Sequence, residues 1–179
     1  MAHLMKLTGV EVGQIAAILL LLFVSVELVR VGPLDSFYIL HSINLVFHEA
    51  GHTIFGLFGT TIGFLGGMFG QLLVPLIVLV AFVRELNWFA VLVSLWWFGQ
   101  NFVDLAPYIG DARSLQLPLI GGEHDFAYLL GEFNLLRYDE FFENIFMAIG
   151  FSIMFIALLL MSTLVYRTIK NRQSIIQSS

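Results

Sequence analysis

The segment LVFHEAGHTIF, residues 45–55, carries His48, Glu49 and His52 in the HExxH arrangement. On a helix, residues four positions apart face the same side, so both imidazoles can reach one ion. Zn²⁺ accepts imidazole nitrogens at about 2.0–2.1 Å and keeps an open position in catalytic sites. The glutamate between the histidines can act as general base toward a metal-bound water. The spacing predicts a Zn²⁺ site with His48 and His52 as ligands and Glu49 as catalytic base.

A polar stripe extends this pattern along the same predicted helix. At 3.6 residues per turn, four side chains fall within a sector of about 80°: His41, Asn44, His48 and His52. Ionisable residues inside a membrane mark functional sites by default. The alternative is that these histidines pack and hydrogen-bond to neighbouring helices, in which case no metal binds.

A catalytic zinc site needs a third protein ligand. We rank the candidates in the order His124, Asp104, Asp125 and Asp111. His124 and Asp125 follow a Gly-Gly pair at 121–122, where the chain can fold back toward the site.

Asp104 shares a predicted helix face with four other residues, Ser94, Trp97, Asn101 and Tyr108. At a rise of 1.5 Å per residue, this part of the face lies at the depth of the two histidines. Asp104 is therefore a candidate ligand or a partner behind the ligands. Asn101 is a candidate donor to a developing oxyanion, and thus a second catalytic residue.

The composition places these residues in a membrane. The chain of 179 residues is 59% hydrophobic and 12% charged, against about 45–50% and 25% in soluble domains. The absence of cysteine excludes disulfides, thiolate catalysis and Cys-based metal sites. The net charge of -5, without a basic run, argues against nucleic acid as a partner and leaves the lipid bilayer as the surroundings.

Apolar runs of about 20 residues predict a single all-α, polytopic membrane domain over 1–179. Five spans are expected, at about 10–29, 34–58, 63–83, 86–106 and 141–166. Within the polar loop 107–140, the apolar piece 126–136 is too short to cross a bilayer and predicts a re-entrant or interfacial helix. No small-residue cleavage site follows the first run, so we expect a retained span rather than a signal peptide.

The basic residues predict the orientation. Five spans place the two ends of the chain on opposite sides. A cytoplasmic C-terminus, with the tail 167–179, puts five basic residues inside (Arg30, Arg84, Arg167, Lys170, Arg172) and three outside (Lys6, Arg113, Arg137). The positive-inside rule favours this arrangement, in a plasma (inner) membrane.

Glycines recur every four residues at the start of the third predicted span, at Gly59, Gly63 and Gly67, with Gly66 and Gly70 offset. Small residues at this spacing let helix backbones approach closely in lipid. The alternative is a re-entrant or strand-like segment that lines a substrate path.

HExxH in a transmembrane helix resembles the site-two protease group of intramembrane zinc metalloproteases, especially its minimal M50-like members. That family adds a run such as N-x-x-P-x-x-x-L-D-G on a later span. Here NFVDLAPYIGDARSLQL offers Asn101, Pro107, Asp111 and Arg113 in the same order, with longer spacing and Ala112 in place of the usual glycine. The resemblance covers roughly 40–115. It implies intramembrane proteolysis, with Asp111 as a metal ligand.

These patterns favour a membrane-embedded zinc metallohydrolase that cleaves an amide (peptide) bond of a membrane-associated substrate. A hydrolase of a lipid amide or ester is the first alternative. A non-enzymatic membrane subunit that carries a metal or relays protons is the second, and a purely structural bundle is the third. The sequence leaves the substrate open and is compatible with a homo-oligomer.

Overall fold

The computed structural model describes residues 7–33, 38–119 and 123–178, and within these ranges it contains helices and no strands. In chain order the elements are α1 (Gly9–Val31), α2 (Tyr38–Phe55), η1 (Gly56–Phe58), α3 (Thr60–Arg84), α4 (Trp88–Gly110), α5 (Asp125–Glu132), η2 (Leu136–Tyr138) and α6 (Asp139–Ser178). The predicted all-α class is confirmed.

Four of these helices, α1, α3, α4 and α6, are long and apolar enough to cross a membrane. The chain is thus a polytopic membrane protein. The helix at the second expected span, α2, is not among the four. Its three histidines and one glutamate lower its hydropathy, and its 18 described residues make it the shortest of the helices at the expected spans.

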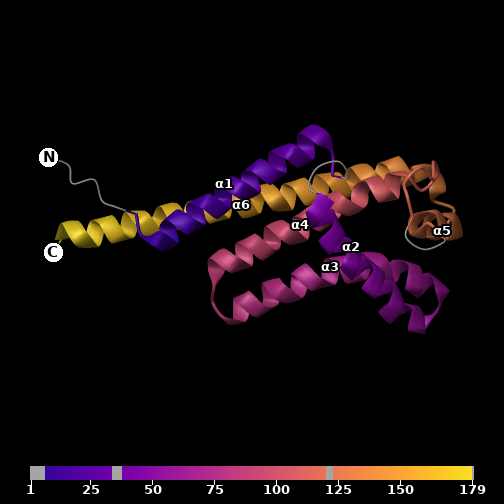
Figure 1. The fold of residues 1–179 in the computed structure, drawn as a ribbon, viewed down its shortest axis with the longest axis horizontal. Coiled ribbons are helices and arrows are strands. Elements are labelled where there is room, and N and C mark those ends of the chain that lie inside the picture. The colour runs from indigo at the N-terminus through magenta and orange to yellow at the C-terminus, as the bar shows by residue number, and fades with distance from the viewer. Residues whose placement is uncertain (1–6, 34–37, 120–122, 179) are drawn as a thin grey trace.

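The four long helices alternate in direction (Figure 1). The first and third of them, α1 and α4, run away from the chain ends, α3 and α6 run back toward them, and α2 lies obliquely. Near the ends, Arg172 Nη2 of α6 donates to Glu11 Oε2 of α1 at 2.7 Å. Both ends of the described chain therefore lie at the same end of the bundle, whereas five spans would place them on opposite sides.

The central helix of the bundle is α4, which packs against α3 and α6. Its buried side includes Val103 and Ala106, both fully enclosed. It approaches α6 through Gly99 and Gly150, because a Cβ at Gly99 would lie only 2.9 Å from the Gly150 carbonyl oxygen. Close packing of this kind is what small residues permit between membrane helices.

Glycines also bring α2 against α3. A Cβ at Gly66 would lie 2.7 Å from the Gly51 carbonyl oxygen, and one at Gly70 would lie 2.7 Å from Gly51 Cα. The prediction of close packing by the glycine spacing is therefore confirmed for these two helices. Over Thr60–Arg84 the segment is one continuous helix, not a strand-like one.

The polar segment after α4 differs from its expected bounds. The helix α4 continues through Pro107 to Gly110, and α6 extends from Asp139 to Ser178. Pro107 lies inside α4, three residues before its last residue, and removes the backbone hydrogen bond that an N–H at this position would make to Val103. The short helix expected within 126–136 is α5, at Asp125–Glu132.

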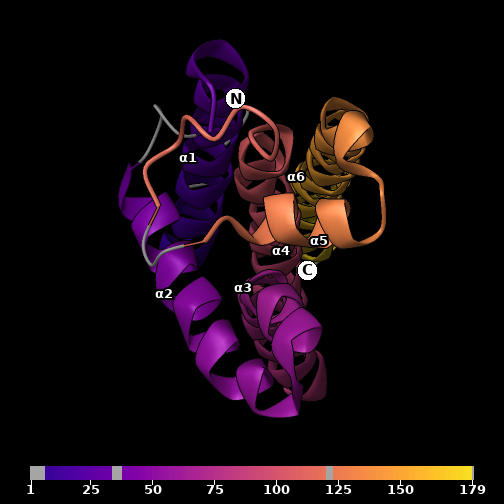
Figure 2. The ribbon, with the colours of Figure 1, turned by 90° about the vertical axis from the view of Figure 1, so that its right-hand side faces the viewer.

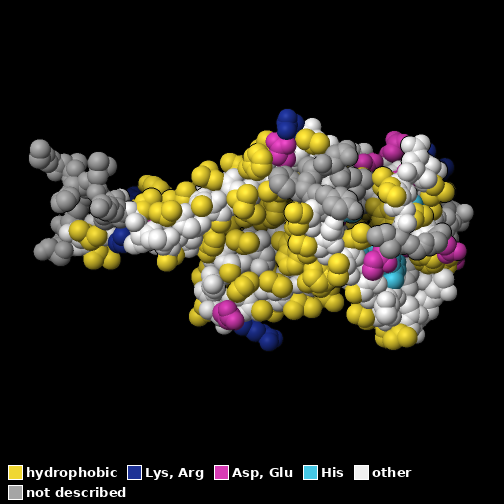
Figure 3. Space-filling view, viewed as in Figure 1, with side chains coloured by type: hydrophobic (Ala, Val, Ile, Leu, Met, Phe, Trp, Pro, Cys, Tyr) yellow, Lys and Arg dark blue, Asp and Glu magenta, His cyan; other side chains and the backbone are white. Residues whose placement is uncertain are grey.

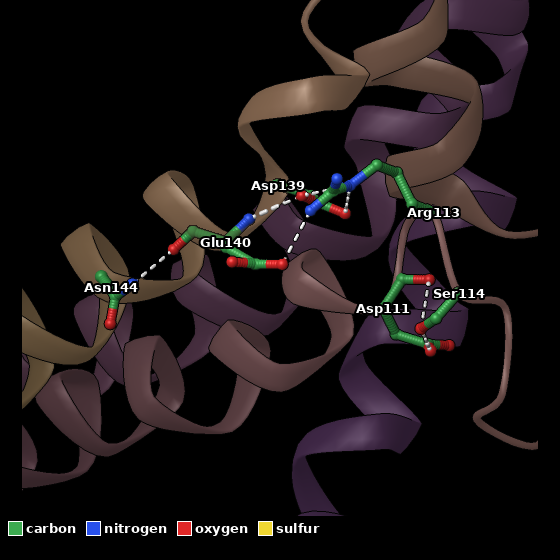
Figure 4. Close-up of polar contacts among 6 residues, drawn as sticks. All are labelled: Asp111, Arg113, Ser114, Asp139, Glu140 and Asn144. Carbon is green, nitrogen blue, oxygen red and sulfur yellow. Dashed lines mark hydrogen bonds and ion pairs between the residues drawn. The ribbon is translucent and has the colours of Figure 1, made fainter.

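An ion-pair cluster joins the end of α4 to the start of α6 (Figure 4). Arg113 Nε donates to both carboxylate oxygens of Asp139 at 2.7 Å, and Arg113 Nη2 donates to Glu140 Oε1 at 2.8 Å. Asp139 is fully buried, so this pairing compensates its charge. The cluster fixes the two ends of the segment from which α5 projects.

Candidate metal centre

A cavity of about 570 Å³ lies between α2, α3, α4 and the segment that leads into α5. Figure 2 looks onto this end of the bundle, with α5 in front and α2 and α3 beside one another. The polar lining of the cavity comprises His41, His48, Glu49, His52, Gln71, Asp104, Tyr108, Glu123 and Asp125. Its apolar lining comprises Leu45, Leu105, Leu117, Pro118 and Leu119.

Three of these side chains converge on one point. Asp125 Oδ2 lies 2.8 Å from His48 Nε2 and 3.0 Å from His52 Nε2. One ligand atom from each of the three residues lies within 4.8 Å of the other two. His48 and Asp125 are buried, and His52 is partly exposed to the cavity. The three residues form the candidate metal centre.

The other nitrogen of each imidazole also has an acceptor. His48 Nδ1 lies 3.1 Å from Gln71 Oε1, and His52 Nδ1 lies 2.8 Å from the Gly63 carbonyl oxygen. A ring with acceptors at both nitrogens is either an imidazolium or a neutral ring with Nδ1–H and a cation at Nε2. The second state is the usual one for metal-ligating histidine, whose outer N–H donates to a carbonyl, carboxylate or water.

The donor set fits Zn²⁺, for which two imidazoles and a carboxylate are common ligands. Bonds of about 2.0–2.1 Å in a tetrahedron place ligand atoms roughly 3.3 Å apart. The contacts of 2.8 and 3.0 Å therefore need to lengthen by only a few tenths of an ångström. Gly67 leaves the space that the two imidazoles occupy. A Cβ at this position would lie 2.6 Å from His52 Nε2 and closer still to His48 Nε2.

Asp125 is the first residue of α5 and is held there from both sides. Its backbone N–H donates to the Tyr108 hydroxyl at 3.0 Å. Burial alone would raise the pKa of Asp125, but hydrogen bonds to the imidazoles of His48 and His52 bring it below its usual value. The carboxylate is therefore ionised at neutral pH, as a metal ligand must be. Figure 3 shows histidine and acidic side chains next to one another at the surface near this end.

His124, the first-ranked candidate for third ligand, faces elsewhere. Its Nδ1 accepts from the Ala127 backbone N–H at 3.2 Å, which makes it the N-cap of α5, and its ring stacks on Tyr108 with centroids 4.2 Å apart. Its Nε2 lies 3.6 Å from Asp111 Oδ2. Burial lowers the pKa of His124, against the opposing effect of Asp111 and Asp125.

Asp111, the ligand that the family resemblance implies, organises the loop after α4. Its carboxylate accepts from the Ser114 hydroxyl and from the backbone N–H groups of Gln116 and Leu117, the last two at 2.9 Å. Burial would raise the pKa of Asp111, but these hydrogen bonds bring it below its usual value. With its oxygens used in this way, Asp111 does not join the three converging residues.

Asp104, the second-ranked candidate, lies behind His48 rather than beside the imidazole Nε2 atoms. Its carboxylate accepts from Gln71 Nε2 at 2.8 Å and Asn44 Nδ2 at 3.3 Å, and its Oδ1 lies 3.0 Å from His41 Nδ1. The polar stripe of α2 thus meets the predicted face of α4, as their matched depth suggested. Of the two roles expected for Asp104, these contacts fit a partner behind the ligands rather than a ligand.

Asn101 turns away from the cavity. Its amide nitrogen donates to the Trp97 carbonyl oxygen at 2.8 Å, and it is not among the described residues that line the cavity. Tyr108, one helical turn beyond Asp104, lines the cavity instead. Its hydroxyl already accepts from Asp125, which leaves the hydroxyl proton available for donation.

Glu49 lines the same cavity as the three converging residues, and it is only partly buried. It follows His48 directly on α2, so the helix places its carboxylate at the margin of the site. This is the position that HExxH predicts for a general base.

The sequence pattern did not indicate a role for Gln71 at this site. For Gly67 it favoured close helix packing, with a segment that lines a substrate path as the alternative. A usable signal existed for Gln71, because it is the only amide side chain in the apolar helix α3. For Gly67 the periodicity could not distinguish contact with a helix from contact with two imidazoles.

No family model, curated protein or solved structure matches this chain.

Proposed function

We propose that this protein is a membrane-embedded zinc metallohydrolase that cleaves an amide bond in a membrane-associated peptide. The observation that carries the proposal is the convergence of His48, His52 and Asp125 on one point at the wall of a cavity. Ligand sites combine such a pocket with a few convergent polar groups. The three donors leave one tetrahedral position open, as catalytic zinc sites do.

The residues around the site supply the remaining roles. A bound zinc ion would lower the pKa of a coordinated water to about 7, and so supply hydroxide at neutral pH. Glu49 accepts the proton of the attacking water and passes it to the leaving nitrogen. Tyr108 takes the role first expected of Asn101 and donates a hydrogen bond from its hydroxyl to the developing oxyanion. Its placement on the cavity wall supports this role.

The charges of the cavity favour an uncharged amide over a phospholipid ester. Among the described residues that line it, none is lysine or arginine, and four are acidic: Glu49, Asp104, Glu123 and Asp125. A phosphate headgroup would find no protein cation there and would be repelled by the carboxylates. A lipid amide without a phosphate remains the alternative substrate.

A continuous set of hydrogen bonds gives a proton relay some support as a second function. It connects Asp125 through His48 and Gln71 to Asp104 and His41. However, Gln71 interrupts this path, because an amide side chain does not titrate. The contacts therefore favour a site in which Gln71 orients His48 over one in which protons move through it.

We further propose a plasma (inner) membrane location with both described chain ends at the cytoplasmic side. The helices α3 and α6 run toward that end. Arg84 lies in the last turn of α3, and Arg167, Lys170 and Arg172 lie in the C-terminal part of α6. Arg30 lies in the last turn of α1, which runs the other way, and Arg113 and Arg137 lie in the segment between α4 and α6. The positive-inside rule favours this orientation. The candidate metal centre then lies toward the outer side.

The substitution Glu49→Gln tests the hydrolase proposal. Zinc-loaded protein in liposomes is incubated with a panel of fluorogenic membrane peptides and, separately, with fluorogenic lipid amides. The wild type is expected to cleave a peptide, and Glu49→Gln to lose at least 100-fold in rate while it binds zinc as tightly. Equal rates for the two proteins would contradict the role of Glu49, and cleavage of the lipid amides alone would replace the peptide by a lipid substrate.

A further inference from the structure

We infer that Gln71, held in one orientation by Asp104, selects the His48 tautomer that metal binding requires, with the proton on Nδ1. The inference rests on the proposed metal centre and adds a positioning residue from α3 to it. Gln71 contacts none of the atoms that converge on the metal position, and it acts only through His48.

The contacts of Gln71 fix which way its amide points. Its Nε2 donates to Asp104 Oδ2 at 2.8 Å, and a carboxylate can only accept. Its Oε1 therefore faces His48 Nδ1, at 3.1 Å. An oxygen at this distance requires a proton on Nδ1, so the neutral His48 ring presents the lone pair of Nε2 to the metal position.

Asp104 is itself held in place. Besides Gln71, it contacts His41 at 3.0 Å and Asn44 at 3.3 Å. Asn44 is fixed in turn by Gln100, which accepts its amide proton at 2.8 Å, and by Trp97, which donates to its oxygen at 3.0 Å. These partners leave Asp104 little freedom to turn away. With Asp104 fixed, a reversed Gln71 amide would place its oxygen against the Asp104 carboxylate, and two acceptors would be in contact.

The burial of this set makes the orientation strict. Gln71 is 3% exposed, so its amide depends on these two protein partners for its hydrogen bonds. Loss of the partner behind a metal-ligating histidine typically weakens metal binding 10- to 100-fold. A carboxylate that fixes the tautomer of a catalytic imidazole through a hydrogen bond is a known arrangement. Here an amide lies between the carboxylate and the imidazole.

The test compares two buried amide side chains. Gln71→Met removes the acceptor of His48 Nδ1–H without a change in charge or much change in volume. Asn101→Leu is the matched control, because Asn101 is also buried but donates to the Trp97 carbonyl oxygen and is not among the described contacts of Asp104. The zinc dissociation constant of the detergent-purified protein is measured by chelator competition. We expect Gln71→Met to weaken binding 10- to 100-fold, and Asn101→Leu to change it less than threefold.

A double-mutant cycle tests the part played by Asp104. If Asp104 acts through Gln71, Asp104→Asn weakens zinc binding in the wild type but has no further effect in Gln71→Met. If Asp104 acts on the metal by its charge alone, the two effects add. Additive effects would overturn the role that we assign to Asp104.

A spectroscopic readout separates positioning from loss of structure. In zinc-loaded protein labelled with ¹⁵N-histidine, the ring N–H protons of His48 and His52 should both be protected from exchange with water. Gln71→Met should remove the protection at His48 only, because the proton of His52 is bound by the backbone oxygen of Gly63. Loss at both rings, or at neither, would contradict the inference.

The outcomes also separate this inference from the proposed function. Wild-type protein that binds no zinc would overturn the metal centre and the inference with it. Wild-type protein that binds zinc, with Gln71→Met binding it equally well, would overturn the inference alone. Zinc binding that depends on Gln71 without any hydrolysis would overturn the hydrolase and leave the inference standing.

Discussion

At the scale of single residues, Gly67 determines whether two imidazoles and a carboxylate can meet. The imidazoles of His48 and His52 lie over it, where any other residue would place a Cβ. Such a contact cannot be relieved by a small shift, because the rings are held from behind by Gln71 and the Gly63 carbonyl oxygen. The helix α3 thus contributes space to the centre as well as hydrogen bonds.

We predict that Gly67→Ala abolishes zinc binding. The added methyl would separate the two Nε2 atoms from the metal position, so a loss of at least 100-fold in affinity is expected by chelator competition. Gly13→Ala in α1 is the control, because a Cβ there meets nothing within 4 Å. It should leave zinc affinity unchanged and stabilise the helix by about 0.5–1 kcal/mol. Normal zinc binding by Gly67→Ala would contradict the placement of the two rings.

The sequence predicted part of this site, for reasons that are specific to each residue. His48, Glu49 and His52 lie on one helix, so their relation depends only on helix geometry. The contact of α2 with Asp104 could be predicted from the matched depth of two helices. Asp125 could not be ranked above its neighbour His124, because a turn of a few residues decides which of two adjacent side chains faces the site.

At the scale of elements, the short helix α5 carries the third donor. Phe126, Leu129 and Leu130 bury its apolar side against α3, α4 and α6. His124 caps its N-terminus and stacks on Tyr108, whose hydroxyl accepts from Asp125. The packing of α5 therefore determines the position of the Asp125 carboxylate.

We predict that Phe126→Ala weakens zinc binding while the four long helices remain folded. Phe126 is buried and contacts the ring of Tyr108, so its loss should cost about 3–5 kcal/mol of local packing energy and displace Asp125. The matched control is Phe133→Ala at the other end of α5, where the side chain is largely exposed. Equal zinc affinities for the two variants, with unchanged far-UV circular dichroism, would show that α5 does not position the donor.

At the scale of the whole molecule, four of the described helices are long and apolar enough to cross a membrane, whereas the sequence predicts five spans. The difference lies at α2, for which the sequence predicts a span and whose polar stripe faces α3 and α4. With four crossing helices, the start and the end of the chain lie on the same side of the membrane; with five, they lie on opposite sides.

We predict that both ends of the described chain react from the same side of the membrane. The chain has no cysteine, so single substitutions give unambiguous labelling. In inside-out vesicles, a membrane-impermeant thiol reagent should label Gly9→Cys and Gln173→Cys but not Gln116→Cys, and in intact cells the reverse. Labelling of positions 9 and 173 from opposite sides would contradict the four-span arrangement.

The central claim is that His48, His52 and Asp125 hold one zinc ion. The most direct measurement is the metal content of the detergent-purified protein, determined by elemental analysis after desalting and without added metal. We expect close to one zinc per wild-type chain and less than a tenth of this in Asp125→Ala, with Glu123→Ala unchanged because its exposed carboxylate does not join the centre. A wild type without metal, or an Asp125→Ala variant with a full zinc ion, would contradict the account.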